Sequence, residues 1–243
     1  RFGKSLWLST LENYYDLARA DDFEQMFGGL KIGQNPTPLH NRYFILKLNF
    51  SVVDPKGNAD AIAASFHRHV NTAIEAFAVQ YREMLNAPIE CHPTDGLSSL
   101  SRLLTAISTT PYKLYVLIDE YDNFANEVMI SPLRGTDRYH ELVQGEGTIK
   151  TFFKAVKDGA EGRGIDRVFL TGVSPVVLSD ITSGYNVAED LSGDPDYHDL
   201  CGFTETELRA ALEATAAAHG LDAAQVETAL AVMRDFYNGY RFT

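Results

Sequence analysis

Residues 114–122 read LYVLIDEYD, and this stretch indicates the fold class of the chain. Its first part, Leu114 to Ile118, is a continuous apolar run of strand length, as expected for a strand buried on both faces of a parallel sheet. An acidic pair, Asp119 and Glu120, follows the run directly. Open α/β sheets bind their ligands at the carboxyl ends of the strands. We therefore expect a ligand site at this end of the strand.

Strand and helix patterns alternate on both sides of this stretch. Large apolar residues alternate with Asn and Lys from Tyr43 through Phe50, which predicts a strand, and Arg167 to Leu170 is predicted to be a second buried strand. Apolar residues at helical spacing predict four helices, from Ser5 to Ala18, from Ile62 to Met84, from Leu100 to Ile107 and from Ile149 to Val156. The alternation predicts an α/β sandwich with a mostly parallel sheet.

The last forty residues are predicted to be helical. Thr204 and Glu207 form a capping box, Gly220 suits a helix C-terminus, and Asp222 starts a second helix whose inward face includes Val226, Leu230, Met233 and Tyr237. We expect a core domain over residues 1–203 and a helical lid or subdomain over 204–243. A polar stretch from Asn126 to Gly147 is expected to form a loop or a second lid.

Composition excludes several classes of protein. The formal net charge of −12 argues against a general nucleic-acid coat, and no apolar stretch approaches the length of a membrane helix. Cys91 and Cys201 are the two cysteines, and they form no CxxC pair, so neither a disulfide framework nor a zinc ribbon is indicated and a reducing cytoplasm is expected. His67, His69 and His92 are expected to be packed or solvated side chains, because their spacing does not suit a metal site.

Gly3, Lys4 and Ser5 stand directly before the first predicted helix. In a phosphate loop, glycine lets backbone N–H groups close on phosphate oxygens, lysine reaches the β- and γ-phosphates, and the serine hydroxyl holds Mg²⁺. The alternative is a chance Gly-Lys-Ser at the start of a helix, since only half of the GxxxxGK[ST] pattern is present.

The acidic pair fits the same chemistry. Asp119 can hold Mg²⁺ through water and Glu120 can polarise the attacking water, although one acidic residue after a strand is more often an ordinary loop charge. After the strand predicted over residues 167–170, the hydroxyls of Thr171 and Ser174 are candidates to sense the γ-phosphate. An ST-turn that caps the following helix explains each hydroxyl equally well.

Five blocks together resemble the bacterial AAA-ATPase-like family, a relative of the archaeal ATPases and STAND NTPases. They are Arg1-Phe-Gly-Lys-Ser5, Leu117-Ile-Asp-Glu-Tyr-Asp122, Leu170-Thr-Gly-Val-Ser174, Asp199-Leu-Cys-Gly-Phe-Thr204 and Tyr237-Asn-Gly-Tyr-Arg-Phe242. The blocks occur in the family's order and span nearly the whole chain.

The resemblance implies a P-loop NTPase sheet that binds ATP and Mg²⁺. It places Walker A at Gly3, Lys4 and Ser5 within a nucleotide-binding segment that runs from Arg1 and Phe2 to Leu6. It places Walker B at Asp119 and Glu120 and a sensor at Thr171 or Ser174. Ser5 and Asp119 would be the magnesium ligands. The first strand and the opening of the phosphate loop are expected to precede Arg1, and restoring about one βα unit, roughly thirty residues, is expected to improve nucleotide binding.

The expected activity is Mg²⁺-dependent ATP hydrolysis that switches an attached domain or partner. Lys4, Glu120, Thr171 and Ser174 are the residues expected to act in catalysis. The resemblance implies a PD-(D/E)XK nuclease-like domain as a C-terminal partner, and no feature indicates binding to nucleic acid or membrane. The alternative is a module that binds nucleotide without hydrolysis and regulates a nuclease or defence system.

Overall fold

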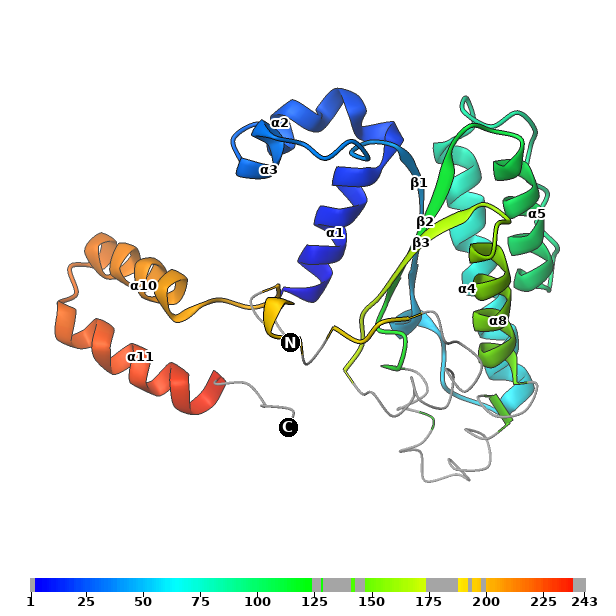
Figure 1. The fold of residues 1–243 in the computed structure, drawn as a ribbon. Helices are drawn as coiled ribbons and strands as arrows, with labels where there is room; N and C mark the ends of the chain where they lie inside the picture. Colours follow the sequence, from blue (N-terminus) through cyan, green and yellow to red (C-terminus); the bar gives the residue numbers. More distant parts are fainter. Residues whose placement is uncertain are drawn as a thin grey trace. The chain divides into compact units, whose positions relative to one another are not determined.

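The structure is a computed structural model that describes residues 3–123, 128, 141–142, 147–173, 188–191, 194–197 and 200–237, apart from the side chains of Asp235 and Tyr237. The loop predicted over residues 126–147 lies mostly outside this part of the chain. Figure 1 shows strands and helices that alternate along the chain, as the sequence predicts.

The centre of the fold is a sheet of three parallel strands in the order β1-β2-β3. Its strands are β1 (Tyr43–Asn49), β2 (Lys113–Asp119) and β3 (Ile165–Leu170). In the register, Asn49 lies beside Asp119 and Ile118 beside Leu170, so the carboxyl ends of the strands meet at one edge of the sheet. The predicted α/β class with a parallel sheet is therefore confirmed.

Three helices cover one face of this sheet (Figure 1). They are α4 (Ala59–Gln80), α5 (Gly96–Ser108) and α8 (Thr148–Ala160). Alternate strand residues such as Phe44, Leu46 and Leu48 join their apolar side chains in the main core. Side chains cap two of these helices, because Asn58 accepts the N–H of Ala61 at 3.0 Å and Asp95 accepts that of Leu97 at 2.9 Å.

Two sequence predictions need correction on this face. The long helix ends at Gln80 and not at Met84, because Tyr81 leaves the helical conformation. The hydroxyl of Tyr81 instead receives the N–H of Ile45 at 3.1 Å, which ties the end of α4 to β1. The strand predicted over residues 167–170 is present within β3, but only Ile165 of β3 is buried and the charged Asp166 and Arg167 are exposed, so the prediction that this strand is buried is wrong.

The opposite face of the sheet is occupied by residues 8–15 of α1 (Lys4–Tyr15) (Figure 1). Lys47 of β1 forms an ion pair of 2.6 Å with Glu12, and the ring of Tyr15 lies 5.8 Å from that of Tyr43 and 5.5 Å from that of Tyr115. The helix predicted from Ser5 to Ala18 is confirmed as far as Tyr15. It ends there because Asp16 has an extended backbone and its side chain accepts the N–H of Ala18.

A buried carboxyl group, Asp16, joins the end of α1 to the end of α4. It accepts the N–H of Ala18 and the hydroxyl of Tyr81, each at 2.8 Å, and the side-chain amide of Gln80 at 2.9 Å. Burial raises the pKa of Asp16, and the hydrogen bonds from Ala18 and Tyr81 oppose that rise. These bonds satisfy a polar group that would otherwise be costly to bury.

Residues 17–42 hold three short helices that the sequence analysis does not predict. They are η1 (Leu17–Asp22), α2 (Phe23–Phe27) and α3 (Lys31–Gln34). Helices of four to six residues contain too few turns for apolar periodicity to show. The rings of Phe23 and Phe27 lie 5.6 and 5.3 Å from that of Tyr14, so this segment packs against α1.

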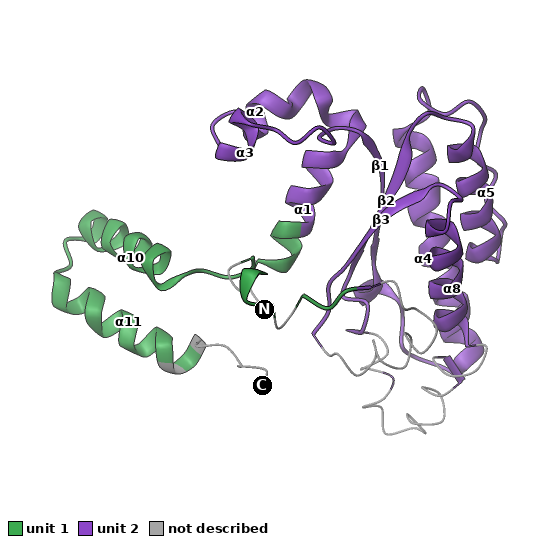
Figure 2. Ribbon diagram, in the orientation of Figure 1, with its two compact units in different colours: residues 1–7, 189–243 green, residues 8–188 purple. Residues whose placement is uncertain are grey.

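The chain divides into two compact units, which Figure 2 colours separately. Unit one comprises residues 1–7 and 189–243, and unit two comprises residues 8–188. The sheet and the helices α4, α5 and α8 belong to unit two, together with η2 (Phe50–Val52). The predicted boundary between residues 203 and 204 stays a prediction.

Unit one contains η3 (Pro195–Tyr197) and an antiparallel pair of helices, α10 (Glu205–His219) and α11 (Ala223–Tyr237). Thr204 and Glu207 form the predicted capping box, and Gly220 ends α10 in a left-handed conformation with φ 68°. The small core between the helices is formed by Ala216, Val226 and Leu230. The two predicted helices are confirmed. No helix in the described part of the chain is long and apolar enough to cross a membrane.

Candidate functional site

The residue before α1, Gly3, has a backbone conformation that favours glycine. Gly3 has a φ of 96°, a backbone conformation that residues with a side chain rarely adopt. Its carbonyl accepts the N–H of Trp7 at 2.7 Å. A Cβ atom at Gly3 would lie 3.0 Å from the backbone nitrogen of Gly202, so space also favours glycine. Both the conformation and the close packing therefore require the glycine that the sequence motif places here.

The residues after Gly3 lie in the first turn of α1. Lys4 is half-buried, whereas Ser5 and Leu6 are exposed. The indole Nε1 of Trp7 is buried and has no hydrogen-bond partner in the described structure. Two residues of the predicted nucleotide-binding segment, Arg1 and Phe2, lie outside the described residues.

The acidic pair lies at the carboxyl edge of the sheet, as predicted. Asp119 is the last residue of β2 and its side chain is 5% exposed. The hydroxyl of Thr171, directly after β3, donates a hydrogen bond to Oδ1 of Asp119. The structure thus brings together two of the predicted site residues from neighbouring strands. Ser174 lies outside the described residues.

Glu120 has an unusual backbone conformation. Its φ is 50°, in the left-handed region, and its carbonyl accepts the N–H of Asn123 at 3.1 Å in a turn. Such a conformation is uncommon for a residue with a side chain, and strained backbone of this kind is concentrated at functional sites. Asp119 is buried and Glu120 is only half-buried, so the two neighbouring carboxyl groups have different environments.

The two segments that follow β2 and β3 remain bonded to each other beyond the strands. The N–H of Thr171 donates to the carbonyl of Ile118 at 2.8 Å, and the N–H of Tyr121 donates to the carbonyl of Thr171 at 3.1 Å. Oδ2 of the buried Asp122 accepts the N–H of Val173 at 2.9 Å. Asp122 ends the sequence block that begins at Leu117, but the sequence does not predict this contact, because nothing in the local pattern identifies a partner so distant in the chain.

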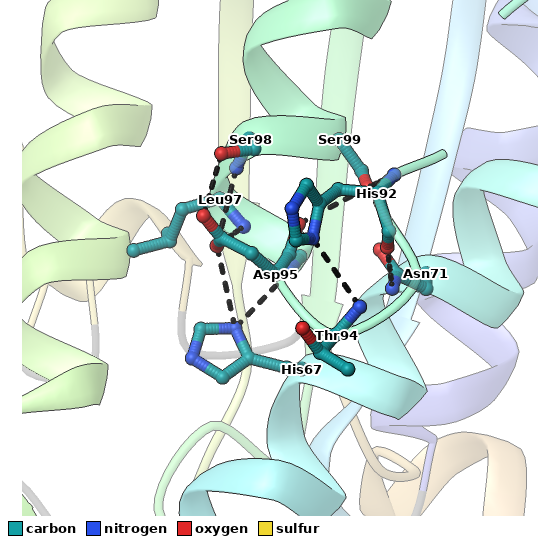
Figure 3. A network of polar contacts seen from close by, with 9 residues as sticks. His67, Asn71, His92, Thr94, Asp95, Leu97, Ser98 and Ser99 are labelled. Atoms are coloured by element: carbon teal, nitrogen blue, oxygen red, sulfur yellow. Dashed lines mark hydrogen bonds and ion pairs between the residues drawn. The ribbon is translucent and has the colours of Figure 1, made fainter. Parts of the chain in front are cut away.

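A second polar network joins α4 to the amino end of α5 (Figure 3). Nδ1 of His67 accepts the N–H of Gly96 at 3.1 Å and lies 3.9 Å from Oδ1 of Asp95, while the hydroxyl of Ser98 donates to Asp95 Oδ2 at 2.5 Å. Burial lowers the pKa of His67, and the charge of Asp95 opposes that effect. Every one of these contacts caps a helix or joins two helices, so this network supports packing.

The titratable residues of this second network do not form a metal site. No group of three histidine, cysteine, aspartate or glutamate side chains with metal-binding geometry occurs among the described residues. Cys91 and Cys201 are free, half-buried thiols, and burial raises the pKa of each. The sheet edge is therefore the better candidate for a functional site.

The features that point to a nucleotide site occur in both units. Gly3 to Ser5 belong to unit one (Figure 2). Asp119, Glu120 and Thr171 belong to unit two. The parallel sheet covered by helices defines an α/β protein, and this fold is consistent with that of the P-loop proteins.

Comparison with known proteins gives the family. The model of the AAA-ATPase-like family, described as "Predicted AAA-ATPase", matches residues 1–182, which is more than half of the chain. The chain therefore belongs to this family. The family's name suggests an ATPase, in agreement with the resemblance found from the sequence motifs.

One curated relative is an uncharacterized protein in the vnfD 5′ region of Azotobacter chroococcum mcd 1. It is 25% identical to this chain over 247 residues, and the match covers 100% of this chain and 40% of the relative. The chain thus spans about two fifths of the length of the relative that it matches. No solved structure matches the chain.

Proposed function

We propose that this protein binds ATP with Mg²⁺ and hydrolyses it, and that its nucleotide state acts as a switch for an attached domain or partner. The observation that carries the proposal is the sheet edge, where Asp119 is buried at the end of β2 and bonded by Thr171 from the segment after β3. Membership in a family described as a predicted AAA-ATPase supports ATP as the nucleotide. The hydrolytic step rests on Glu120.

The residues present suit a magnesium nucleotide. Gly3 has the positive φ that glycine tolerates, and α1 follows with its N-terminal N–H groups, which can bind phosphate oxygens. The hydroxyl of Ser5 and the carboxyl group of Asp119 are oxygen donors, which Mg²⁺ prefers. A bound Mg²⁺ would neutralise charge that develops on the phosphate oxygens.

Each residue of the site has one proposed role. Lys4 supplies a positive charge to the β- and γ-phosphates, and the segment Arg1 to Leu6 supplies backbone contacts. Glu120 orients the attacking water and accepts its proton. The hydroxyl of Thr171, with that of Ser174, reads the state of the γ-phosphate. Catalysis then consists of positioning and electrostatic stabilisation, as in other phosphoryl-transfer enzymes.

Three further parts of the proposal concern the rest of the protein. We propose that α10 and α11 serve as a lid, because two helices with so small a core of their own need another surface to pack on. The nuclease-like partner domain and the strand before Arg1 are carried into the proposal from the resemblance. The cytoplasm is the proposed location.

The experiment compares steady-state phosphate release and ATP affinity for the full-length protein and three variants. Glu120→Gln keeps the shape of the side chain and is expected to lower turnover by roughly 10²-fold with ATP affinity nearly unchanged. Lys4→Ala is expected to weaken ATP binding itself, because it removes a charged contact to phosphate. Glu161→Gln, at the exposed end of α8, is the matched control and is expected to behave as the wild type.

The outcome separates an ATPase from a regulatory module. If the wild type bound ATP but released phosphate no faster than Glu120→Gln, hydrolysis would be rejected and a module that binds nucleotide without turnover would be favoured. If Lys4→Ala bound ATP as tightly as the wild type, the position of the phosphate loop would be rejected.

A further inference from the structure

The carboxyl group of Asp122 is buried, which is unfavourable unless the group has hydrogen-bond partners. Its side chain is 1% exposed, and Oδ2 accepts the N–H of Val173 at 2.9 Å from a position 51 residues away in the sequence. Burial of a carboxyl group is unfavourable unless hydrogen bonds compensate for the lost water. The bond to Val173 therefore fixes the backbone of the segment after β3 to the segment after β2.

This bond extends a ladder that begins inside the sheet. The backbone bonds of Thr171 to Ile118 and of Tyr121 to Thr171 continue the pairing past the ends of β2 and β3. The contact between Asp122 and Val173 adds another rung beyond them. The ladder thus covers the residues on which the proposed chemistry depends, Asp119, Glu120 and Thr171.

Gly172 shows how closely the two segments approach. A Cβ atom at this position would lie 2.3 Å from Cε1 of Tyr121 and 2.7 Å from Oδ1 of Asp122. Gly172 is not among the glycines with positive φ, so its backbone conformation does not require glycine. Space requires it, because the ring of Tyr121 and the carboxyl group of Asp122 occupy the volume that any side chain would need.

The left-handed Glu120 lies between two residues of this ladder. On one side Asp119 receives the Thr171 hydroxyl, and on the other the N–H of Tyr121 donates to the Thr171 carbonyl. Thr171 therefore holds the backbone on both sides of Glu120. Such fixed surroundings are what a strained residue needs in order to keep its conformation.

We propose that Asp122 is a positioning residue, whose hydrogen bond to Val173 fixes Glu120 and Thr171 relative to each other for hydrolysis. This inference rests on the proposed ATPase function. Loss of the bond frees the segment after Thr171, so turnover falls, because a small misplacement of a reacting group has a large effect on rate. ATP affinity changes little, because the proposed charge and backbone contacts to the phosphates come from Gly3, Lys4 and Ser5, and Thr171 contributes mainly by sensing the γ-phosphate.

The test uses the full-length protein with four variants. Asp122→Ala removes the acceptor of the Val173 N–H, whereas Asp122→Asn retains an amide oxygen that can accept it. Gly172→Ala separates the same two segments without changing Asp122. Asp95→Ala is the matched control, since Asp95 also accepts backbone N–H groups but lies at the start of α5. The measurements are kcat for phosphate release, the Kd for ATP and the thermal midpoint.

We expect Asp122→Ala and Gly172→Ala to lower kcat by about tenfold or more with a Kd within about twofold of the wild type. Asp122→Asn is expected to restore most of the turnover. Asp95→Ala is expected to lower the thermal midpoint and leave kcat unchanged. A merely structural role of Asp122 would produce the pattern of Asp95→Ala.

Two failures can be told apart. If the wild type and Asp95→Ala hydrolyse ATP and both Asp122→Ala and Gly172→Ala match them, the positioning role is rejected and the ATPase stands. If the wild type releases no phosphate, the proposed function is rejected and the positioning role with it. Equal damage by Asp122→Asn and Asp122→Ala would also reject the role, because the acceptor would then not be the feature that matters. Should Asp122→Ala fail to fold, Gly172→Ala and Asp122→Asn decide the question.

Discussion

The amino end of α5 and the carboxyl edge of the sheet both use aspartates to hold backbone N–H groups, but over different distances along the chain. Asp95 accepts the N–H groups of Leu97 and Ser98, two and three residues away. Asp122 accepts that of Val173, 51 residues away, and Asp119 receives a hydroxyl 52 residues away. The first arrangement stabilises one helix. The second joins two strand ends, so a change at either end alters the position of the other.

The largest effect is expected for Thr171→Val, which tests the long-range arrangement. Valine keeps the shape of threonine and removes the hydroxyl that donates to the buried Asp119. We expect the free energy of unfolding to fall by about 3 kcal/mol, because a buried carboxyl group loses a hydrogen bond. Urea denaturation measures the change. Thr72→Val is the matched control, since its hydroxyl bonds to the carbonyl of Arg68 on an exposed face of α4, and it should change stability by about 0.5 kcal/mol or less. Equal losses in the two variants would show that the buried pair has no special weight.

Gly96→Ala tests the close approach of α4 and α5 beside the local cap. A Cβ atom at Gly96 would lie 2.9 Å from Cβ of Val70 and 3.0 Å from the carbonyl oxygen of His67. The helices must separate to accept it, and we expect a loss of about 2 kcal/mol in urea denaturation. Gly29→Ala is the control, because a Cβ atom there meets nothing within 4 Å. The prediction fails if the two variants are equally stable.

Asp95→Ala removes the local cap itself and should have a smaller effect. The free energy of unfolding is expected to fall by about 1 kcal/mol, as for other helix N-caps. Asp95→Asn should retain most of this stability, since its oxygen can still accept the N–H of Leu97. The pKa of Asp95 is lowered, because burial, which raises it, is outweighed by hydrogen bonds from Ser98 and Leu97. If Asp95→Asn lost as much free energy of unfolding as Asp95→Ala, the charge of Asp95 and not its capping hydrogen bond would be what stabilises the helix.

The smallest effect concerns pH and His67. Burial holds the pKa of His67 below its ordinary value of 6.5, and the charge of Asp95 opposes this effect. As the pH falls, His67 is therefore protonated at a higher pH in the unfolded chain than in the folded protein. Stability is therefore fully present above about pH 6.5 and is lost as the pH falls toward the lower pKa of the folded protein. His69 acts in the same direction, because burial lowers its pKa too.

His67→Asn measures the share of His67 in this pH dependence. Asparagine can accept the N–H of Gly96 without titrating, so its thermal midpoint should decline less between pH 7 and pH 5 than that of the wild type. An unchanged decline would assign the pH dependence to other groups.

The sequence predicts those parts of the fold that depend on local patterns. The apolar run at residues 114–118 identifies β2, and the spacing of Thr204 and Glu207 identifies the capping box of α10. Helical periodicity locates α4 but not its end, because Tyr81 leaves the helix to bond with Ile45 and Asp16, and a tertiary contact of this kind has no local signature.

The candidate site is predictable in part for the same reason. Walker-type positions at Lys4 and Asp119 follow from short motifs, and β2 does deliver Asp119 to the sheet edge. The left-handed conformation of Glu120 and the contact between Asp122 and Val173 depend on segments about fifty residues apart. A single sequence does not identify the two partners of such a pairing. Gly172 is consistent with the close approach, but a glycine alone does not name the residue that it packs against.

The position of Trp7 gives the protein an optical probe of its own. It is the single tryptophan of residues 1–243, its indole Nε1 is buried, and its backbone N–H is bonded to Gly3 in the first turn of α1. Among residues 1–243, fluorescence excited where tyrosine does not absorb therefore arises from the first turn of α1, directly after the proposed phosphate-binding residues Gly3, Lys4 and Ser5. Nucleotide binding there can be followed through the emission of an unlabelled protein.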